Sequence, residues 1–100
     1  MVKEIILTPL AISDYDNIIE YLMSEWGISV TNDFIERFQN ARILLAKNPG
    51  IFPFQDKVKQ VQKCFLTKQN ILYFKETDEV IKIITIFDTR QNPSKLTSIV

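Results

Sequence analysis

The side chains best suited to chemistry lie in the last third of the chain. The apolar run Val80 to Phe87 is followed directly by Asp88-Thr89-Arg90-Gln91-Asn92-Pro93. An apolar strand that delivers charged and amide side chains to the rim of a sheet is a common way to build a binding or reactive edge. Arginine grips a phosphate with a planar fork and lysine with a point charge, so a phosphodiester is a candidate ligand. The side chains that could hold it and stabilise a pentacoordinate phosphate are Lys59, Lys63, Lys68, Tyr73, Asp88, Arg90 and Asn92.

Proton transfer is the weak point of this candidate set. The chain has no histidine, which is the usual general base at neutral pH. Lysine and tyrosine have pKa values near 10, so the pKa of either would have to fall by about two to three units before it could act as a base at pH 7. Two structural alternatives stay open. Tyr73 could be a core ring with its hydroxyl at the rim, and Arg90 could form a local ion pair with Asp88 or stabilise a turn.

Composition excludes several classes of chemistry. Without histidine, neither a Ser-His-Asp nor a Cys-His hydrolase is possible. The two glycines, Gly27 and Gly50, cannot form a glycine-rich phosphate loop. No cluster of carboxylates indicates a metal site, so we expect neither a metal nor a cofactor. The one cysteine, Cys64, lies in an apolar strand pattern and is predicted to be a buried thiol rather than a nucleophile.

Length and composition indicate one globular unit. A chain of 100 residues can bury roughly 65% of its unfolded surface around one core, so we expect a single domain over residues 1–100. The hydrophobic content of 46% and the charged content of 24% are ordinary for such a protein. No apolar run approaches the roughly 20 residues that cross a bilayer, and no signal peptide is recognisable. A cytoplasmic protein without membrane contact is therefore expected.

The net charge of zero conceals an uneven distribution along the chain. Residues 1–40 carry two basic and seven acidic side chains, for a net charge of −5. Residues 41–75 carry seven basic and one acidic, which gives +6, and residues 76–100 carry three basic and four acidic, which gives −1. Such asymmetry could make one face basic enough to meet nucleic acid or an acidic partner. The alternative is that these lysines form a solvated strand face.

The periodicity predicts two helices after a short first strand, Lys3 to Leu7. Thr8 supplies an N-cap hydroxyl and Pro9 occupies the first helical position, and the helix should end at Gly27 as a left-handed cap. Its apolar face has the 3–4 spacing of a helix and comprises Ala11, Tyr15, Ile18, Ile19, Leu22, Met23 and Trp26. The second helix is expected from about Thr31 to Lys47, capped by Ser29 or Thr31. Its inner face comprises Phe34, Phe38, Ala41 and Leu45, and Asn48-Pro49-Gly50 stops it.

The remaining apolar runs predict a sheet that covers this helical hairpin. Strands are expected over Val58 to Leu66, Asn70 to Phe74 and Val80 to Phe87. Short polar turns at 67–69 and 76–79 separate them, which favours an antiparallel meander. The last strand is rich in β-branched residues and is expected to be central. The predicted fold is α+β, with the order β-α-α-β-β-β and a helical hairpin packed on an antiparallel sheet.

Several blocks of the chain resemble one known family. They are Thr8-Pro9-Leu10-Ala11, Asp16 to Leu22, Asn48-Pro49-Gly50, Val61-Gln62-Lys63-Cys64, Leu72-Tyr73-Phe74 and Ile86 to Pro93. With them the chain resembles the RelE/ParE superfamily of toxins from bacterial type II toxin–antitoxin modules. The ending, in which an apolar strand runs into an arginine and a proline, is similar to the ParE-like, plasmid-stabilisation branch. The resemblance implies a helical hairpin on an antiparallel sheet, in agreement with the periodicity.

The resemblance also implies inhibition of bacterial growth, by one of two routes. ParE-type relatives inhibit DNA gyrase, whereas RelE-type relatives cleave mRNA in the ribosome with basic and tyrosine side chains. Zero net charge is unfavourable for an RNase that binds along phosphates, so a gyrase poison is expected, with Lys63, Asp88, Arg90 and Asn92 as the target-binding residues. The alternatives are a metal-independent endoribonuclease acting at the ribosome through Lys59, Lys63, Tyr73 and Arg90, and a non-toxic relative that keeps only the interaction.

A toxin of this kind implies an antitoxin that wraps its surface. Such segments commonly lay a helix on the hairpin and an extended piece against the sheet. Candidate docking residues are the aromatic side chains Tyr15, Trp26, Phe52 and Phe54; the alternative for Phe52 and Phe54 is that they cap the core. The assembly would be a homodimer or a toxin–antitoxin hetero-oligomer. Many similar toxins carry arginine at the position of Gln62, so no role is carried over to that residue.

Overall fold

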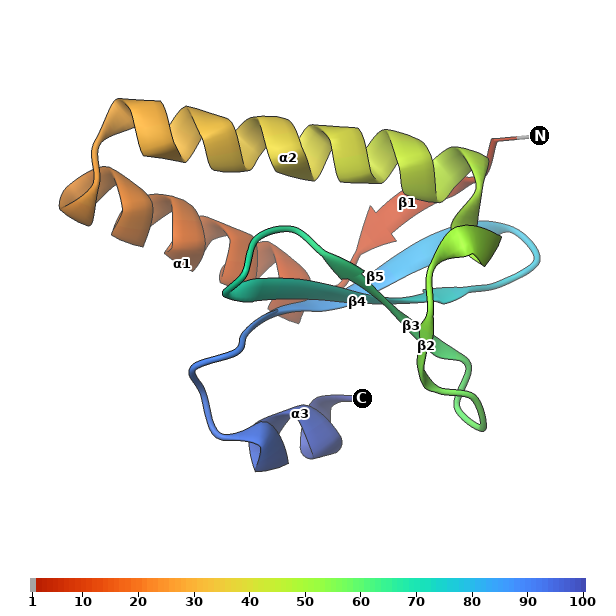
Figure 1. Ribbon diagram of the computed structural model, residues 1–100. Coiled ribbons are helices and arrows are strands. Elements are labelled where there is room, and N and C mark those ends of the chain that lie inside the picture. The colour runs from red at the N-terminus through yellow and green to blue at the C-terminus, as the bar shows by residue number, and fades with distance from the viewer. Residues whose placement is uncertain (1) are drawn as a thin grey trace.

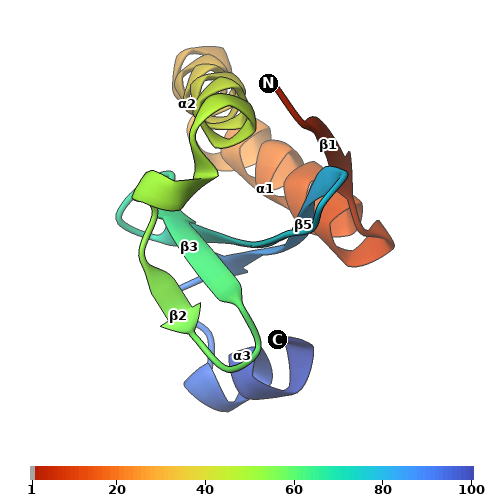
Figure 2. The ribbon, with the colours of Figure 1, turned by 90° about the vertical axis from the view of Figure 1, so that its right-hand side faces the viewer.

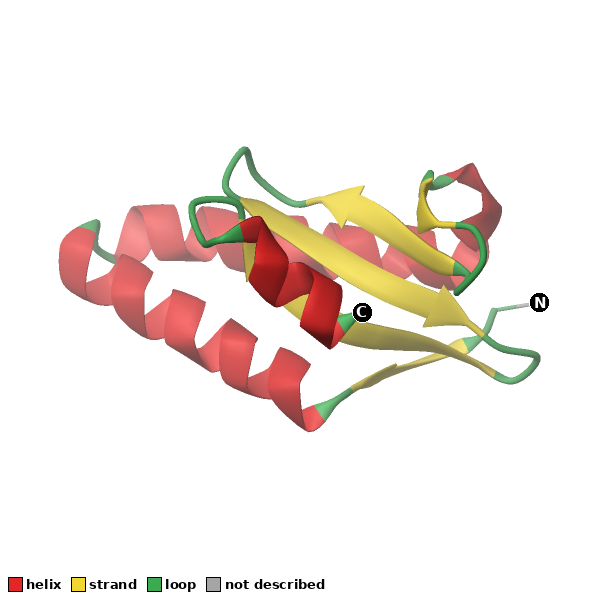
Figure 3. Cartoon of the chain, turned by 90° about the horizontal axis from the view of Figure 1, so that it is seen from below, coloured by secondary structure: helices red, strands yellow, loops and turns green. Residues whose placement is uncertain are grey.

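A helical hairpin lies on one face of a five-stranded sheet, and a short third helix crosses the other face (Figures 1 and 3). The computed structural model describes residues 2–100. Its elements, in chain order, are β1 (Glu4–Leu7), α1 (Pro9–Glu25), α2 (Ile28–Lys47), the 3-10 turn η1 (Pro49–Ile51), β2 (Phe54–Asp56), β3 (Val61–Phe65), β4 (Asn70–Glu76), β5 (Val80–Asp88) and α3 (Pro93–Ile99). Within residues 2–100, no helix is both long and apolar enough to span a bilayer.

The helical hairpin begins as predicted but turns more sharply. Thr8 caps α1, and its hydroxyl accepts a hydrogen bond from the Ala11 backbone N–H at 3.1 Å. Gly27 has φ +85°, a conformation that favours glycine. It also serves as the N-cap of α2, so the predicted start near Thr31 with a Ser29 or Thr31 cap is wrong. Because Gly27 reverses the chain at once, Thr31 lies inside the helix and bonds the Gly27 carbonyl at 2.9 Å.

The sheet confirms the predicted α+β fold and adds detail to it. The strand order is β1-β5-β4-β3-β2, so β5 is an interior strand and β4 is the middle one. The strands from β2 to β5 pair as an antiparallel meander, whereas β1 runs parallel to β5. Three elements were not predicted: the 3-10 turn η1, the short edge strand β2 and the helix α3. The predicted start of β3 at Val58 is wrong, because Val58 is 95% exposed and Gln60, at φ +60°, turns the chain before Val61.

Side chains on alternate sides of the sheet build two separate apolar clusters. The hairpin side holds the main core, in which the predicted inner face of α2 is buried against residues such as Leu72, Phe74 and Ile83. The opposite side holds Val61, Ile71, Tyr73 and Phe87, with Leu96, Ile99 and Val100 packed over them. Figure 2 shows the sheet between the hairpin and α3. The apolar face of α1 is shorter than predicted, because Met23 and Trp26 are exposed where the hairpin extends beyond the sheet (Figure 1).

Helix α1 closes the edge of β5 beyond the end of β1. The register of β4 and β5 shifts next to Tyr73, which leaves Ile84 without a cross-strand partner. The Ile84 carbonyl instead accepts a hydrogen bond from the Thr8 hydroxyl at 2.6 Å. Further along α1, the Asp14 carboxylate accepts from the Thr85 hydroxyl and, at 3.1 Å, from the Ile86 backbone N–H. These bonds fix α1 against the strand that carries Asp88 at its end.

Candidate functional site

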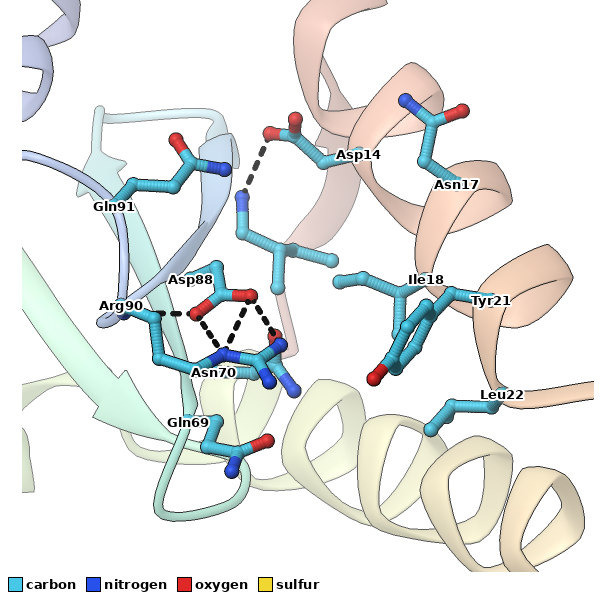
Figure 4. A pocket seen from close by; sticks show the side chains of 11 residues that line it. Asp14, Asn17, Ile18, Tyr21, Leu22, Gln69, Asn70, Asp88, Arg90 and Gln91 are labelled. Atoms are coloured by element: carbon cyan, nitrogen blue, oxygen red, sulfur yellow. Dashed lines mark hydrogen bonds and ion pairs between the residues drawn. The ribbon is translucent and has the colours of Figure 1, made fainter. Parts of the chain in front are cut away.

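A pocket of about 210 Å³ lies between α1 and the point where β5 leaves the sheet (Figure 4). Helix α1 contributes Asp14, Ile18 and Tyr21 to its walls, and the chain after β5 contributes Arg90. The β3–β4 turn closes the pocket from the far side. The pocket therefore combines residues that are far apart in sequence, around the block that the sequence singled out.

Asp88 and Arg90 form a short-range clamp at the rim of this pocket. Arg90 Nη2 lies 2.6 Å from Asp88 Oδ2, and Arg90 Nε lies 3.0 Å from Asp88 Oδ1. The same carboxylate accepts the Arg90 backbone N–H at 2.8 Å, as aspartate does in tight turns. The hydrogen bonds from Arg90 hold the pKa of Asp88 below its usual range. The ion-pair alternative for Arg90 is therefore the observed arrangement.

The ion pair with Asp88 leaves the Arg90 guanidinium partly exposed beside Tyr21. Its carbon lies 5.9 Å from the centre of the Tyr21 ring, a cation–π distance (Figure 4). Asp88 in the first place, and Tyr21 after it, raise the pKa of Arg90 further above its ordinary value. The side chain is still 54% exposed. Arg90 is thus a permanently charged, oriented donor that can bind an acceptor but cannot transfer a proton.

The rest of the terminal block serves the structure. Thr89 donates its backbone N–H to the Gln69 carbonyl at 2.8 Å and so ties the block to the β3–β4 turn. Asn92 caps α3, because its side-chain oxygen accepts the Ser94 backbone N–H at 3.0 Å, and Pro93 is the first residue of that helix. The terminal block therefore has two parts: residues 88–91 form the rim of the pocket, and residues 92–93 begin α3. A role of Asn92 in target binding stays a prediction.

Lys63 and Tyr73 lie on the other face of the sheet from this pocket. They are cross-strand partners in β3 and β4, so the structure does bring these two together. Tyr73 is only 3% exposed in the cluster below α3, and this burial raises the pKa of its hydroxyl. Lys63 Nζ lies 3.3 Å from Gln55 Oε1 and 5.8 Å from the centre of the Phe65 ring.

The two remaining lysines of the candidate set, Lys59 and Lys68, lie apart from each other and from the pair of Lys63 and Tyr73. Lys59 is exposed after β2 and lines a small hollow of about 110 Å³ beside Leu96 and Thr97 of α3. Lys68 is exposed in the β3–β4 turn. The four residues of the ribonuclease hypothesis therefore do not share a pocket. Lys59 and the pair of Lys63 and Tyr73 lie towards α3, and Arg90 lies beside α1.

The four aromatic candidates for antitoxin docking differ in exposure. Tyr15 packs on Phe38 and Phe34, with ring centres 4.7 and 6.0 Å apart, and Phe52 meets Phe74 edge-on at 5.8 Å. Both are thus partly committed to the core. Trp26 is 65% exposed and Phe54 39% exposed, and both remain available to a partner.

Two residues of β3, Gln62 and Cys64, are buried and contribute to the fold. Cys64 is buried as predicted, and burial raises the pKa of its thiol. Gln62, also buried, donates from Nε2 to the carbonyls of Pro49 at 2.8 Å and Phe52 at 3.1 Å. In the described part of the chain, no group of three His, Cys, Asp or Glu side chains is arranged to hold a metal ion.

Sequence reasoning missed the part of the site that comes from α1. Asp14 could have been noticed, since it lies three residues after Ala11 and four before Ile18, a spacing that points a carboxylate towards the core. Tyr21 gave no such signal. Its proximity to Arg90 depends on how α1 crosses the end of β5, which no local pattern encodes.

A family model and several solved structures match this chain. The model of the family described as ParE toxin of type II toxin-antitoxin system, parDE, matches residues 5–93. No curated protein sequence shows significant similarity to the chain.

Solved toxin structures share the fold at low sequence identity. A structure of the chromosomal ParDE system from P. aeruginosa matches with a TM-score of 0.72 at 16% identity, over 87% of this chain and 96% of that chain. The YoeB dimer from Staphylococcus aureus matches with 0.63 at 13% identity, over 87% and 97%. The E. coli DinJ-YafQ toxin-antitoxin complex matches with 0.61 at 13% identity, over 90% and 96%.

Proposed function

This chain belongs to the family of ParE toxins of type II toxin–antitoxin systems, and on that premise we propose that it inhibits bacterial growth by binding and poisoning DNA gyrase. Arg90 is the central contact residue, held in place by Asp88. A cognate antitoxin neutralises the toxin, and the chain works in the cytoplasm without a cofactor. Lys63, on the opposite face of the sheet, and Asn92, which caps α3, are secondary contacts in this proposal.

One observation favours binding over catalysis: the candidate residues lie on opposite faces of the sheet. Side chains alternate between the two faces of a strand. Ile86 packs in the hairpin-side core, so Asp88 belongs to the same face, while Tyr73 lies in the opposite cluster. Tyr73 has a raised pKa and Arg90 holds its proton, so neither is suited to act as a base at neutral pH.

The alternative, a ribosome-dependent endoribonuclease, draws support from a single arrangement. Lys63 and Tyr73 are adjacent across β3 and β4, which is what a phosphate-binding lysine next to a phenol would require. For this chemistry, α3 would have to leave the face that it covers, since Leu96 and Ile99 pack on the cluster containing Tyr73. A relative that retains only the antitoxin interaction is the third possibility.

Induction of the chain in bacteria, alone and together with the neighbouring small gene, tests the proposal. We expect growth arrest in the first case, with DNA breaks, filamentation and intact mRNA, and growth in the second. Purified gyrase should give cleaved DNA in the presence of the toxin. Mapped mRNA cuts with an intact chromosome would reject the gyrase target, and unaffected growth would reject toxicity altogether.

Arg90→Ala, with Lys95→Ala as a control, tests the rim. Both substitutions remove an exposed cation near the end of the chain, but only Arg90 lines the pocket. We expect Arg90→Ala to abolish growth arrest and Lys95→Ala to retain it, with both proteins folded by circular dichroism. A folded and fully toxic Arg90→Ala protein would show that the rim does not contact the target.

A further inference from the structure

The turn between β2 and β3 presents an exposed aliphatic side chain between two lysines. Val58 is 95% exposed, and its neighbours Lys57 and Lys59 are exposed as well. Figures 1 and 2 show that this turn extends from the sheet on the side of α3. We call residues 57–60 the basic tip. Because Val58 makes so little contact with the rest of the chain, its side chain is available to a partner.

The basic tip is an ordered turn. The Asp56 carboxylate accepts the Lys59 backbone N–H at 3.1 Å. The Lys57 carbonyl accepts the Gln60 backbone N–H at 3.3 Å and the Gln60 side-chain amide at 2.7 Å. Gln60, at φ +60°, then directs the chain into β3. A turn that is already closed in this way loses less conformational entropy when it binds a partner.

Three further lysines lie on the sheet face from which the tip extends. Val61 and Tyr73 belong to the cluster below α3. Lys63 and Lys75 each follow one of them by two residues in the same strand, so they share that face. Lys82 is the cross-strand partner of Lys75. Two like charges directly opposite each other destabilise a sheet, and a bound anion would relieve this repulsion.

No carboxylate balances these lysines. The ion pairs within residues 2–100 are formed by Lys3 and Arg90, and none involves the tip or the lysines of this face. The nearest acidic side chains lie towards the other edge of the sheet, with Glu4 in β1 and Asp78 and Glu79 in the β4–β5 turn. Positive charge is therefore in excess around β2 and β3, and a polyanion is the complementary partner.

The shape of the tip favours duplex DNA among the polyanions. The major groove of B-DNA, about 12 Å wide, admits a two-stranded β-ribbon such as β2–β3, whereas the major groove of an RNA helix is too narrow. Single strands bind by stacking on exposed aromatic rings. On this face Tyr73 and Phe87 are buried, and the exposed Phe65 lies at the far end of β3 from the tip.

We propose that the basic tip binds duplex DNA by entering its major groove. Lys57 and Lys59 contact the phosphates on the two sides of the groove, and Val58 lies against the base edges between them. Lys63 and Lys75 contact the adjoining phosphates. This inference rests on the proposed function, because a gyrase that cleaves DNA holds a duplex, and it adds a direct contact between the toxin and that duplex.

The tip and the rim are placed so that both can be occupied at once. Asp88, which begins the rim, pairs with Asn70 at one end of the sheet, whereas Val61, which follows the tip, pairs with Lys75 near the other end. A toxin that contacts gyrase through Arg90 therefore keeps its basic tip free for DNA.

Fluorescence anisotropy with a labelled 20-bp DNA duplex tests the proposal on the protein alone. Contacts of four lysines with phosphates predict that log K falls with log[salt] with a slope of about −3 to −4. Single-stranded DNA and an RNA duplex of the same sequence should bind at least fivefold more weakly. Tighter binding of either one, or displacement of the DNA by an equal charge concentration of polyglutamate, would overturn the choice of duplex DNA.

Two double variants of equal charge separate the tip from general electrostatics. Lys57→Ala/Lys59→Ala removes the lysines of the tip, and Lys47→Ala/Lys68→Ala removes two exposed lysines outside it, in α2 and in the β3–β4 turn. The tip variant should bind DNA at least tenfold more weakly, with a salt slope smaller by about two, because each phosphate contact contributes about one. The control should retain both values. Equal losses in the two folded variants would refute the tip.

Val58→Ser tests whether the tip enters the groove. The substitution keeps both lysines, and no core contact is lost because Val58 is exposed. We expect the affinity for the duplex to fall two- to fivefold while the salt slope stays the same. An unchanged affinity would show that the tip binds along the backbone without entering the groove, against the proposal.

The DNA-binding assay is independent of toxicity. If the tip binds the duplex as described but induction of the chain leaves growth unaffected, the proposed function fails and the DNA-binding tip stands. If induction arrests growth with DNA breaks but the purified protein does not bind the duplex, the tip proposal fails on its own.

Discussion

The carboxylate of Asp14 accepts a hydrogen bond from the hydroxyl of Thr85, 71 residues later in the chain. Thr85 is almost completely buried, and the same carboxylate oxygen also accepts the Ile86 backbone N–H. The contact takes the place of a neighbouring strand, because β1 ends at Leu7, paired with Ile83. It sets the position of α1, and with it Tyr21, relative to Arg90.

Asp14→Ala should lower the free energy of unfolding by about 2–3 kcal/mol, because it leaves a buried hydroxyl and a backbone N–H without their acceptor. Asp16→Ala is the matched control, since Asp16 is an exposed carboxylate on the same helix; its effect should stay within about 0.5 kcal/mol. Urea unfolding followed by circular dichroism measures both. Equal losses in the two variants would show that the contact with Thr85 adds no stability.

Gly27→Ala should destabilise the protein by about 1–3 kcal/mol, because φ +85° is strained for any residue with a Cβ. An added Cβ would meet no atom within 4 Å, so the loss is conformational rather than steric. Gly50→Ala is the matched control, as its Cβ also meets nothing and its φ is not in the positive range. Thermal unfolding should therefore separate the two variants clearly. A Gly27→Ala protein as stable as Gly50→Ala would contradict the strained turn.

Asp88 should contribute stability that disappears in acid. Hydrogen bonds from Arg90 place its folded-state pKa below the ordinary value of 3.8. The contribution is thus complete above the unfolded-state pKa and is lost as the pH falls through the folded-state pKa. It should not exceed about 1 kcal/mol, because the pair faces solvent.

Unfolding free energies of wild type and Asp88→Asn, measured from pH 6 down to pH 2, test this dependence. The difference between them should be present at pH 6 and vanish at the acid end. In an NMR titration, Arg90→Ala should bring the pKa of Asp88 back up towards its ordinary value. An unchanged titration in Arg90→Ala would assign the lowered pKa to another cause.

Tyr73→Phe should leave toxicity within about twofold of wild type if the chain is a gyrase poison, because the raised pKa keeps the Tyr73 hydroxyl protonated and the ring serves packing. The ring volume is nearly unchanged, so the fold should be retained. The measurement is the inducer concentration that halves the growth rate. A folded Tyr73→Phe protein that no longer arrests growth would favour the ribonuclease alternative.

The sequence pattern predicted those elements whose signals are local. Thr8-Pro9 marks the start of α1, and the 3–4 spacing from Phe34 to Leu45 marks the buried face of α2. Helix α3 was missed although Asn92-Pro93 is a cap-and-proline pair of the same kind, because the pair was interpreted as part of the rim. Strand β2 has only three residues and forms through its partner β3.

The candidate site was predicted in part for the same reason. Asp88 and Arg90 are two residues apart, so their pairing is encoded locally. Tyr21 and Asp14 join them only through the crossing of α1 over β5, which depends on the register shift at Ile84 and on the hydrogen bonds of Thr8. Tertiary packing determines such contacts between distant residues, and local sequence patterns do not predict them.

The parallel pairing of β1 with β5 also fixes when the rim can form during synthesis. Glu4 pairs with Val80, so the first strand has no partner until most of the chain has been made. Contacts between such distant residues form late, because a long loop must be closed before they stabilise the fold. A partly synthesised chain therefore contains neither the closed edge of β5 nor the pocket beside Arg90. The rim over 88–91 and its pocket can therefore form only after β5 and the residues that follow it have been synthesised.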